Sequence, residues 1–490
     1  MDSKPERTPV AGPHLALPVA LGAALLSALA FYWGTGLHPL WWLTWLAPLP
    51  LLLLAPRLSA RAAFGFSWVS ASVGALNLWH YFRHDLESPA LLCVVVVILP
   101  SAIFALGVHL FRRCILNATP WHATLIFPSF WAAYEYLQAI TSPHGTALNL
   151  AYSQMNFPPI LQLASLTGIW GISFCVFLFP ATLAALFTGR NGPEQKSRLA
   201  ASIAAILLVV LGFGVWRLHT SDQASIATVA LLASDLPQNT LPTTEEDSIR
   251  LLREYVAQID LLASQHPAVF VIPEKIAVVR ESYLQPVDSL FSSAAARTAA
   301  VVIVGLVRRD AHGLRNEARV YSPQGGPPLT YEKHHMLPPF ESPFVVGTSL
   351  ATIHQPSGDW GITICKDMDF PRLSRQYAQQ GTALLLVPAW DFDSDGWLHG
   401  RMAILRGVEA GFSIARAPRH GLLTVSDDRA RVLAQRQTNS APFVTLVANI
   451  PVVHHTTLYS QWGDWFAWLC IAMFLTTAIT SRRMPRVRES

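Results

Sequence analysis

Long apolar stretches fill the first 220 residues of the chain and return near its C-terminus, whereas shorter apolar runs alternate with polar ones in between. A helix needs about 20 predominantly apolar residues to cross the hydrocarbon core of a bilayer. The stretches of about that length are 14–32, 39–56, 62–82, 89–111, 121–140, 158–188, 200–217 and 463–481. We therefore predict a polytopic α-helical membrane protein with about eight spans. The stretch 158–188 is longer than one span requires, so we expect it to begin with a surface or re-entrant portion.

The segment between the last two stretches has the shorter periodicity of a folded α/β domain. Residues 225–234 and 299–307 are rich in β-branched and other apolar side chains, which favours strands, and residues 245–264 and 398–410 have helical spacing. Strands that alternate with helices indicate a layered α/β domain. The expected organisation is a membrane domain at 1–219, an inserted α/β domain at 220–457, and a final span with a basic tail at 458–490.

Basic residues gather in the loops on one side of the predicted membrane. These residues are Lys4, Arg7, Arg57, Arg61, Arg112, Arg113, Arg190, Lys196, Arg198, Arg482, Arg483, Arg486 and Arg488. The alternate loops carry only Arg83, beside Asp85 and Glu87. Because basic loops stay in the cytoplasm, we expect both termini to be cytoplasmic and the α/β domain to be translocated to the opposite side of the membrane.

The composition agrees with a membrane protein and argues against nucleic-acid binding. Apolar residues make up 52% of the chain and charged residues 13%, about half the usual charged share. Residues 218–460 carry 20 Lys and Arg against 23 Asp and Glu, out of 35 and 31 in the whole chain. The basic excess therefore belongs to the membrane-flanking segments and not to a folded domain that would bind nucleic acid.

One cysteine stands apart from the other four. Cys365 is the only cysteine in the α/β segment, which rules out a disulfide within that segment, and no CxxC or Cys/His cluster indicates zinc. It follows the apolar run GITI, which predicts a strand that delivers a thiol to a turn. Helix-end dipoles and the adjacent ammonium of Lys366 are expected to favour the thiolate.

Two further residues make Cys365 a candidate nucleophile. Glu274 ends the run AVFVIPE, and Lys333 lies in the turn sequence YEKHH. Considered alone, Glu274 would be interpreted as a solvated turn carboxylate, Lys333 as a surface cation and Cys365 as a small buried side chain. Together they form a set for acyl transfer, with Cys365 as nucleophile, Glu274 as proton carrier and Lys333 as the cation that stabilises the tetrahedral intermediate.

The sequence resembles the nitrilase, or carbon–nitrogen hydrolase, superfamily in this Glu-Lys-Cys set. Within this superfamily, the chain resembles the apolipoprotein N-acyltransferases, in which a nitrilase-like domain follows seven N-terminal membrane spans and precedes one C-terminal span. The membrane segments contain motifs that are similar to those of this family. They are GTGLHPLWWLTWLAPLPLL, FPSFWAAYEYL, LNLAYSQMNFPPILQLASLTGIWGISF and TLYSQWGDWFAW. The resemblance implies an α-β-β-α sandwich with Glu274, Lys333 and Cys365 as catalytic residues and Glu341 as an additional acidic residue.

The resemblance also implies a reaction. A fatty acyl chain passes from a phospholipid, phosphatidylethanolamine being the expected donor, through a Cys365 thioester to the amine of a diacylglyceryl apolipoprotein. It implies a location in the bacterial inner membrane with the α/β domain in the periplasm, and no cofactor or metal. We also expect a monomer in the lipid bilayer that binds no nucleic acid.

Several positions depart from the family near the expected pocket. Lys366 and Asp367 stand where the family commonly has Tyr-Glu, and Asp367 is expected to replace the carboxylate with a shorter reach. Trp390 lies in the segment VPAWD, where the family has an Asn-Asp-Ala-Trp type of sequence, and His399 follows Leu398 where the family has Gln-His. We expect these residues to bind substrate or to support the catalytic ones.

Three other functions remain open from the sequence. A membrane-tethered amidase would use the same triad, with water as the acyl acceptor. A paralogue that binds lipoproteins without modifying them would not need all three catalytic residues. A transporter would need more ionisable residues in its spans than the few found there, such as Glu135 and His80.

Overall fold

The computed structural model describes residues 17–189, 192–220, 224–234, 241–242 and 244–483. The chain divides into two compact units. The first unit is Met1–Trp131, Phe174–Leu207 and Cys470–Ser490, and the second is Ala132–Ser173 and Leu208–Leu469. The second unit thus contains part of the helical region as well as the α/β domain. The boundaries at 219/220 and 457/458 stay a prediction. Of the basic residues used to orient the chain, Lys4, Arg7, Arg190, Arg486 and Arg488 lie outside the described residues.

Among the described residues, four helices are long and apolar enough to cross a membrane. They are α1 (Leu17–Gly34), α5 (Ala90–Asn117), α9 (Ile169–Thr188) and α10 (Pro193–His219). The remaining helices of this region are α2 (Trp41–Leu46), α3 (Leu49–Leu54), α4 (Ala60–Ala75), α6 (Pro120–Thr141) and α16 (Trp465–Arg483). The stretch 39–56 is divided at Pro48, which cannot donate a helical hydrogen bond. The structure therefore has a helical region with four candidate spans, and the count of about eight stays a prediction.

The long stretch 158–188 begins, as expected, with a portion that does not span. It forms two single-turn helices, α7 (Pro158–Leu161) and α8 (Ala164–Thr167), before α9 starts at Ile169. Gly168 separates α8 from α9 with a φ of 65°, a conformation in which glycine avoids the steric cost of a side chain. This portion belongs to the second unit.

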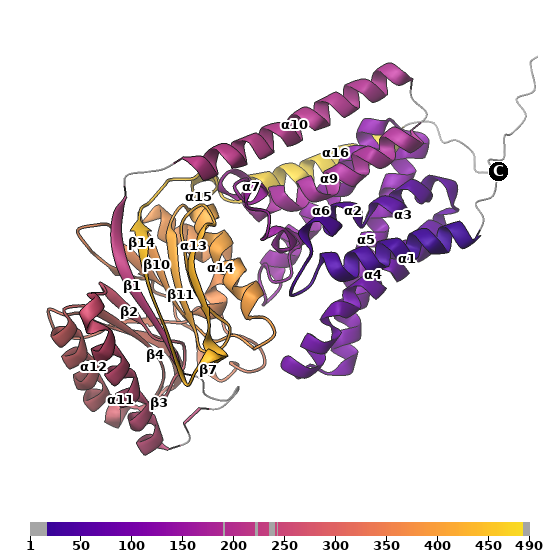
Figure 1. The fold of residues 1–490 in the computed structure, drawn as a ribbon. Helices are drawn as coiled ribbons and strands as arrows, with labels where there is room; N and C mark the ends of the chain where they lie inside the picture. Colours follow the sequence, from indigo (N-terminus) through magenta and orange to yellow (C-terminus); the bar gives the residue numbers. More distant parts are fainter. Residues whose placement is uncertain (1–16, 190–191, 221–223, 235–240, 243, 484–490) are drawn as a thin grey trace, which may run out of the picture. The chain divides into compact units, whose positions relative to one another are not determined.

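The α/β part of the second unit consists of two sheets that face each other (Figure 1). The first sheet contains β1 (Ser225–Ser234), β2 (Val269–Val271), β3 (Val278–Arg280), β4 (Val301–Asp310), β5 (Gly313–Tyr321), β6 (Leu329–Glu332), β7 (Phe344–Val345) and β14 (Phe443–Val452). The second contains β8 (Ala351–Ile353), β9 (Trp360–Ile362), β10 (Leu384–Ala389), β11 (Ser413–Pro418), β12 (Leu422–Ser426) and β13 (Val432–Gln437). In the first sheet the main order is β14-β1-β2-β4-β5-β6, and in the second it is β13-β12-β11-β10-β9-β8.

Helices cover the outer face of each sheet (Figure 1). The helices are α11 (Glu245–Leu262) and α12 (Leu284–Thr298) on the first sheet, and α13 (Pro371–Gln379) and α14 (Gly396–Ala410) on the second, with α15 (Leu458–Trp462) near the end of the chain. Successive residues of a strand face opposite sides. On β1, Val229 and Leu231 therefore pack between the sheets, and Ala230 and Leu232 pack under α11. This layering is the α/β nitrilase-like sandwich predicted from the sequence.

Candidate active site

Strand ends bring the candidate catalytic residues to one edge of the sandwich. Strands β9 and β10 are parallel neighbours, so their carboxyl ends lie at the same edge. Cys365 follows β9 and Trp390 follows β10. Glu274 follows β2 of the other sheet, and its backbone N–H donates to the carbonyl oxygen of Ala389 across 3.2 Å. The two sheets are thereby joined where the candidate residues meet.

Glu274, Lys333 and Glu341 form one buried hydrogen-bonded network. The Nζ of Lys333 donates to Glu274 Oε1 at 2.8 Å and to Glu341 Oε2 at 2.7 Å. The Nδ2 of Asn316, on β5, donates to Glu274 Oε1 at 2.6 Å and to Glu341 Oε1 at 2.9 Å. All four residues are at most 2% exposed, so their charges interact with little screening by water.

Lys275 brings a second ammonium to this network. Its Nζ lies 2.5 Å from Glu341 Oε1 and 3.7 Å from Glu274 Oε1. The same ammonium lies over the ring of Trp390, 5.1 Å from the centroid, and 5.8 Å from the ring centroid of Phe344. Lys275 has a φ of 50°, an uncommon backbone conformation that turns the chain directly after Glu274. Lys275 was not among the residues expected at the site, although it immediately follows the catalytic candidate Glu274.

The charges of the network are fixed by mutual attraction. Burial acts to lower the pKa of Lys333, but the attraction of Glu274 and Glu341 outweighs burial and raises this pKa well above its ordinary value. Burial acts to raise the pKa of Glu341, but Lys333 and Lys275 outweigh it and hold the pKa well below its ordinary value. Lys333 is therefore a permanent cation, and Glu341 a permanent anion, at neutral pH.

Cys365 opens a short 3₁₀ turn, Cys365–Asp369, in a left-handed conformation with a φ of 44°. Its Sγ–H donates to the carbonyl oxygen of Trp390 at 3.3 Å. Burial raises the pKa of the Cys365 thiol well above its ordinary value, Glu274 raises it further, and Lys333 opposes the rise only in part. The thiol is therefore neutral at rest. The expectation that its surroundings favour the thiolate was wrong, because burial and the Glu274 carboxylate dominate.

Lys366 bonds to groups other than the neighbouring thiol. Its Nζ lies 3.1 Å from Asp369 Oδ2 and 3.3 Å from His144 Nδ1, and 5.9 Å from the ring centroid of Phe370. Burial and the nearby Lys366 ammonium lower the pKa of His144. The Lys366 side chain therefore connects the nucleophile turn to a segment of the helical region within the second unit.

Asp367 connects the nucleophile turn to the lysine loop. Its Oδ2 accepts from the Tyr331 hydroxyl at 2.7 Å and from the backbone N–H of Ile364 at 3.1 Å. Its Oδ1 accepts from the backbone N–H groups of His334 at 3.2 Å and His335 at 2.9 Å. Asp367 is fully buried, so it supports the site through these bonds.

Trp390 lies at the site, whereas His399 is directed elsewhere. The guanidinium of Arg419 lies 4.2 Å from the Trp390 ring centroid. His399 Nε2 lies 3.1 Å from Asp395 Oδ2 on the same helical turn. Burial acts to lower the pKa of His399, but Asp395 outweighs it and raises this pKa to about 9. No bond in the described part of the chain joins His399 to Glu274, Lys333 or Cys365.

A buried ion pair that was not expected from the sequence lies behind the nucleophile. Arg416 on β11 makes a two-pronged contact with Asp391, with Nη1 2.6 Å from Oδ2 and Nη2 on Oδ1. Both residues are at most 2% exposed. An arginine in the middle of the apolar run SIARAP was the available signal, because a buried guanidinium needs a carboxylate partner.

Comparison with known proteins gives matches over both parts of the chain. Residues 22–182 match the model of the apolipoprotein N-acyltransferase N-terminal domain, and residues 241–434 match that of carbon-nitrogen hydrolases. An apolipoprotein N-acyltransferase from Geobacter metallireducens is 24% identical over 96% of this chain and 96% of its own length. Those from Pseudomonas putida and Haemophilus ducreyi are 26% and 28% identical, over 96% and 71% of this chain and 97% and 75% of their own lengths. The chain therefore matches both family models, and these relatives match most of its length.

Proposed function

The chain belongs to the apolipoprotein N-acyltransferase family, and from that membership we propose that it transfers a fatty acyl chain from a membrane phospholipid to the N-terminal amine of a lipoprotein. The observation that carries this proposal is the network of Glu274, Lys333 and Glu341 around the neutral thiol of Cys365. A thiol, a carboxylate and a permanent cation are the groups that acyl transfer through a thioester requires.

The first half of the reaction acylates Cys365. Glu274 takes the thiol proton as sulfur attacks the ester carbonyl of the phospholipid, and Lys333 balances the negative charge on the tetrahedral oxygen. The bond to the glycerol oxygen then breaks, and Glu274 returns the proton to that oxygen. Lysophospholipid leaves, and Cys365 carries the acyl chain as a thioester.

The second half of the reaction returns the free thiol. The neutral amine of the diacylglyceryl-cysteine attacks the thioester carbonyl, and Glu274 takes a proton from the amine nitrogen. The carbon–sulfur bond breaks, the sulfur recovers a proton, and the lipoprotein leaves with an amide-linked acyl chain. Exclusion of water in favour of the amine separates this transfer from hydrolysis by an amidase.

The proposal extends to the location of the protein and to its partners. The chain forms about eight spans with domains at 1–219, 220–457 and 458–490, both termini are cytoplasmic, and the α/β domain faces the periplasm. It works as a monomer with phosphatidylethanolamine as acyl donor. Both substrates are lipids, so a membrane enzyme can receive them without extracting either from the bilayer.

The test is intact-mass spectrometry of the full-length protein in detergent after incubation with phosphatidylethanolamine. We expect an acyl adduct that hydroxylamine removes and that Cys365→Ser does not form as a thioester. The adduct should persist in water and discharge onto a diacylglyceryl lipopeptide. Rapid clearance by water without transfer to the lipopeptide would support the amidase instead, and no adduct in the wild-type protein would refute the mechanism.

A further inference from the structure

A cavity of about 420 Å³ lies within the second unit, away from the candidate catalytic residues. Its walls include Met155, Leu218, Arg401, Ile404, Arg431 and Val432. None of Glu274, Lys333 and Cys365 lines it. Two arginines among apolar side chains give this cavity a charged part and an apolar part.

Arg401, on α14, has a charge that the protein does not balance directly. Within the described part of the chain, no carboxylate pairs with its guanidinium, and its Nε–H is buried without a hydrogen-bond acceptor. Its Nη2 donates to Gln435 Oε1 at 3.2 Å, and the guanidinium lies 5.5 Å from the ring centroid of Trp397. A partly buried cation with an unsatisfied donor is stabilised by an anion that enters the cavity.

Arg431 adds a second guanidinium, and the carboxylate beside it is already engaged. Asp427 Oδ1 accepts from the backbone N–H groups of Arg429 and Arg431, both at 3.0 Å. Asp427 Oδ2 lies 2.5 Å from Arg431 Nε. The Arg431 side chain is 46% exposed, so its remaining donors can reach a ligand.

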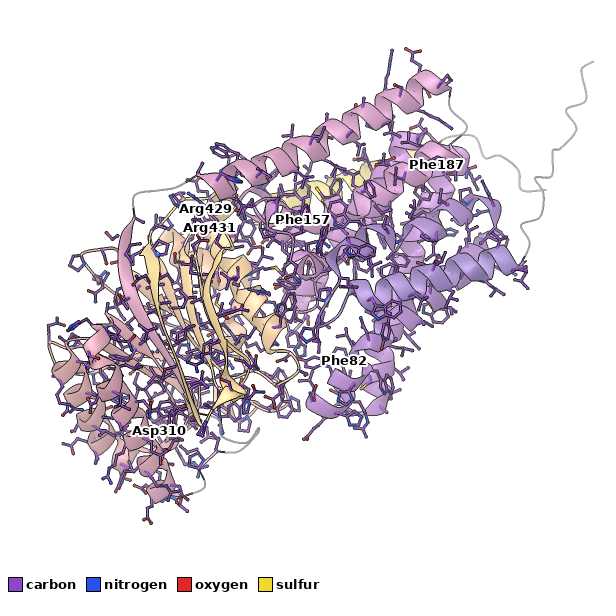
Figure 2. All side chains as sticks on the ribbon, in the orientation of Figure 1. Phe82, Phe157, Phe187, Asp310, Arg429 and Arg431 are labelled. Carbon is purple, nitrogen blue, oxygen red and sulfur yellow. The ribbon has the colours of Figure 1, made fainter. Side chains whose placement is uncertain are left out.

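The surrounding segment has more basic than acidic side chains. Asp428 Oδ2 lies 3.2 Å from Arg217 Nη2 and 3.0 Å from His455 Nδ1, and Asp428 Oδ1 lies 3.9 Å from Arg429 Nε. Figure 2 labels Arg429 and Arg431 at this end of the sandwich. Four arginines thus accompany two aspartates, which leaves a positive field at the cavity.

The apolar wall of the cavity includes a residue at the end of a candidate membrane span. Leu218 is the penultimate residue of α10, and the neighbouring Trp216 is 62% exposed. A 27-residue helix is about 40 Å long, which covers the hydrocarbon core and reaches the headgroup region. Exposed tryptophans are enriched at that level of the bilayer. With α10 across the membrane, the cavity would open at the depth of phospholipid phosphates.

We propose that this cavity binds the headgroup of a membrane phospholipid that is held and not consumed. Arg401 and Arg431 bind the phosphate, and Leu218 and Val432 contact the glycerol and the first methylene groups. The bound lipid anchors the α/β domain at the membrane surface. The proposal goes beyond lipoprotein N-acylation and needs only that α10 spans the membrane.

The test is photocrosslinking of the full-length protein in nanodiscs with a phosphatidylethanolamine that carries a diazirine on its headgroup. Peptide mass spectrometry then locates the label, independently of any thioester at Cys365. We expect label on residues 155–158 and 430–432, and about a tenfold loss of that label in Arg401→Gln and in Arg431→Gln. Arg436→Gln is the matched control, because Arg436 lies on the same strand as Val432 but bonds to the Thr445 carbonyl and does not line the cavity.

Competition distinguishes a lipid site from other occupants. Added phosphatidylglycerol should compete with the probe and reduce labelling of the cavity, whereas diacylglycerol and millimolar inorganic phosphate should not. Undiminished labelling in both arginine variants would overturn the proposal, as would absence of label from 155–158 and 430–432. If inorganic phosphate reduced labelling as much as phosphatidylglycerol does, the occupant of the cavity would be a free anion and not a phospholipid. Arg431→Gln keeps the test decisive if Arg401→Gln does not fold, because the Arg431 side chain is largely at the surface.

Discussion

Lys275 Nζ lies 2.5 Å from Glu341 Oε1, so the carboxylate that holds Lys333 is itself held by a second ammonium. Each oxygen of Glu341 therefore binds a different lysine. Lys275 also faces Trp390, which links the charge network to the residue whose carbonyl oxygen accepts from the nucleophile.

Replacement of Lys275 with methionine should slow thioester formation about tenfold. Loss of this ammonium lets the pKa of Glu341 rise towards its ordinary value, so the acid limb of the pH–rate profile should move to higher pH. Lys275→Arg keeps the positive charge, so its acid limb should lie at the same pH as that of the wild type. Arg250→Gln, at an exposed ion pair, is the control. An acid limb in Lys275→Met identical to that of the wild type would show that Lys275 does not tune Glu341.

The variant Glu274→Gln should make the Cys365 thiol more reactive towards iodoacetamide while turnover is lost. The Glu274 carboxylate raises the pKa of Cys365, so its neutralisation lowers that pKa and increases the thiolate fraction at a given pH. The measurement is the alkylation rate between pH 7 and pH 10, followed by peptide mass spectrometry. Slower alkylation in the variant would mean that Glu274 promotes thiolate formation even without substrate.

Lys366→Met should leave the pH dependence of Cys365 alkylation unchanged. The Lys366 ammonium is directed to Asp369 and His144, and it is not among the leading causes of the pKa shift of Cys365. We expect a lower thermal midpoint in detergent, because Asp369 then remains buried without its cation. A rise of one pH unit in the midpoint of the alkylation profile would instead show that Lys366 activates the thiol.

Asp367→Asn should destabilise the protein by about 1–3 kcal/mol and also reduce thioester formation. The asparagine –NH₂ would face the backbone N–H of Ile364, which then loses its acceptor, and the nucleophile turn would separate from the lysine loop. Thermal midpoints and acylation rates are measured together. A large loss of rate with an unchanged midpoint would indicate that Asp367 contacts substrate.

His399 should make the stability of the protein depend on pH. Its folded pKa of about 9 lies above the ordinary value of 6.5, so the stabilisation is complete below pH 6.5 and is lost as the pH rises through 9. We expect the thermal midpoint to fall between pH 6.5 and pH 9.5, and His399→Gln to flatten that fall. Equal slopes in both proteins would assign the dependence to another group.

The strongly patterned parts of the fold were accessible from the sequence. The run 225–234 forms β1 over those same residues, and 245–264 corresponds to α11. Strand β13 was missed because Val432–Gln437 has three apolar residues followed by three polar ones at an exposed sheet edge, so it lacks the alternation that marks a half-buried strand. Cys365 does not end a strand, since β9 stops at Ile362 and the left-handed turn that follows leaves no signal in the pattern of side chains.

The site shows the same division. Strand ends identified Glu274 and Cys365 as candidates and a turn identified Lys333, and the structure places the Cys365 thiol within the electrostatic influence of both charged residues. The direction of a side chain is set by long-range contacts, which a single sequence does not contain. Lys366 is adjacent to Cys365 in sequence yet bonds to His144, 222 positions away, whereas Lys275 reaches Glu341, 66 positions away.

The inclusion of residues 132–173 in the second unit limits how the chain can be cut or recombined. The hydroxyl of Thr146 donates to the Asp369 carbonyl at 2.8 Å, and the backbone N–H of Ile169 donates to Glu409 at 2.8 Å. A fragment expressed from residue 220 onwards would expose these buried acceptors and leave Glu409 without its donor. A chimera that grafts the sandwich onto a foreign set of helices would therefore need to carry 132–173 with it. For protein engineering, the smallest transferable part of this enzyme is discontinuous in sequence.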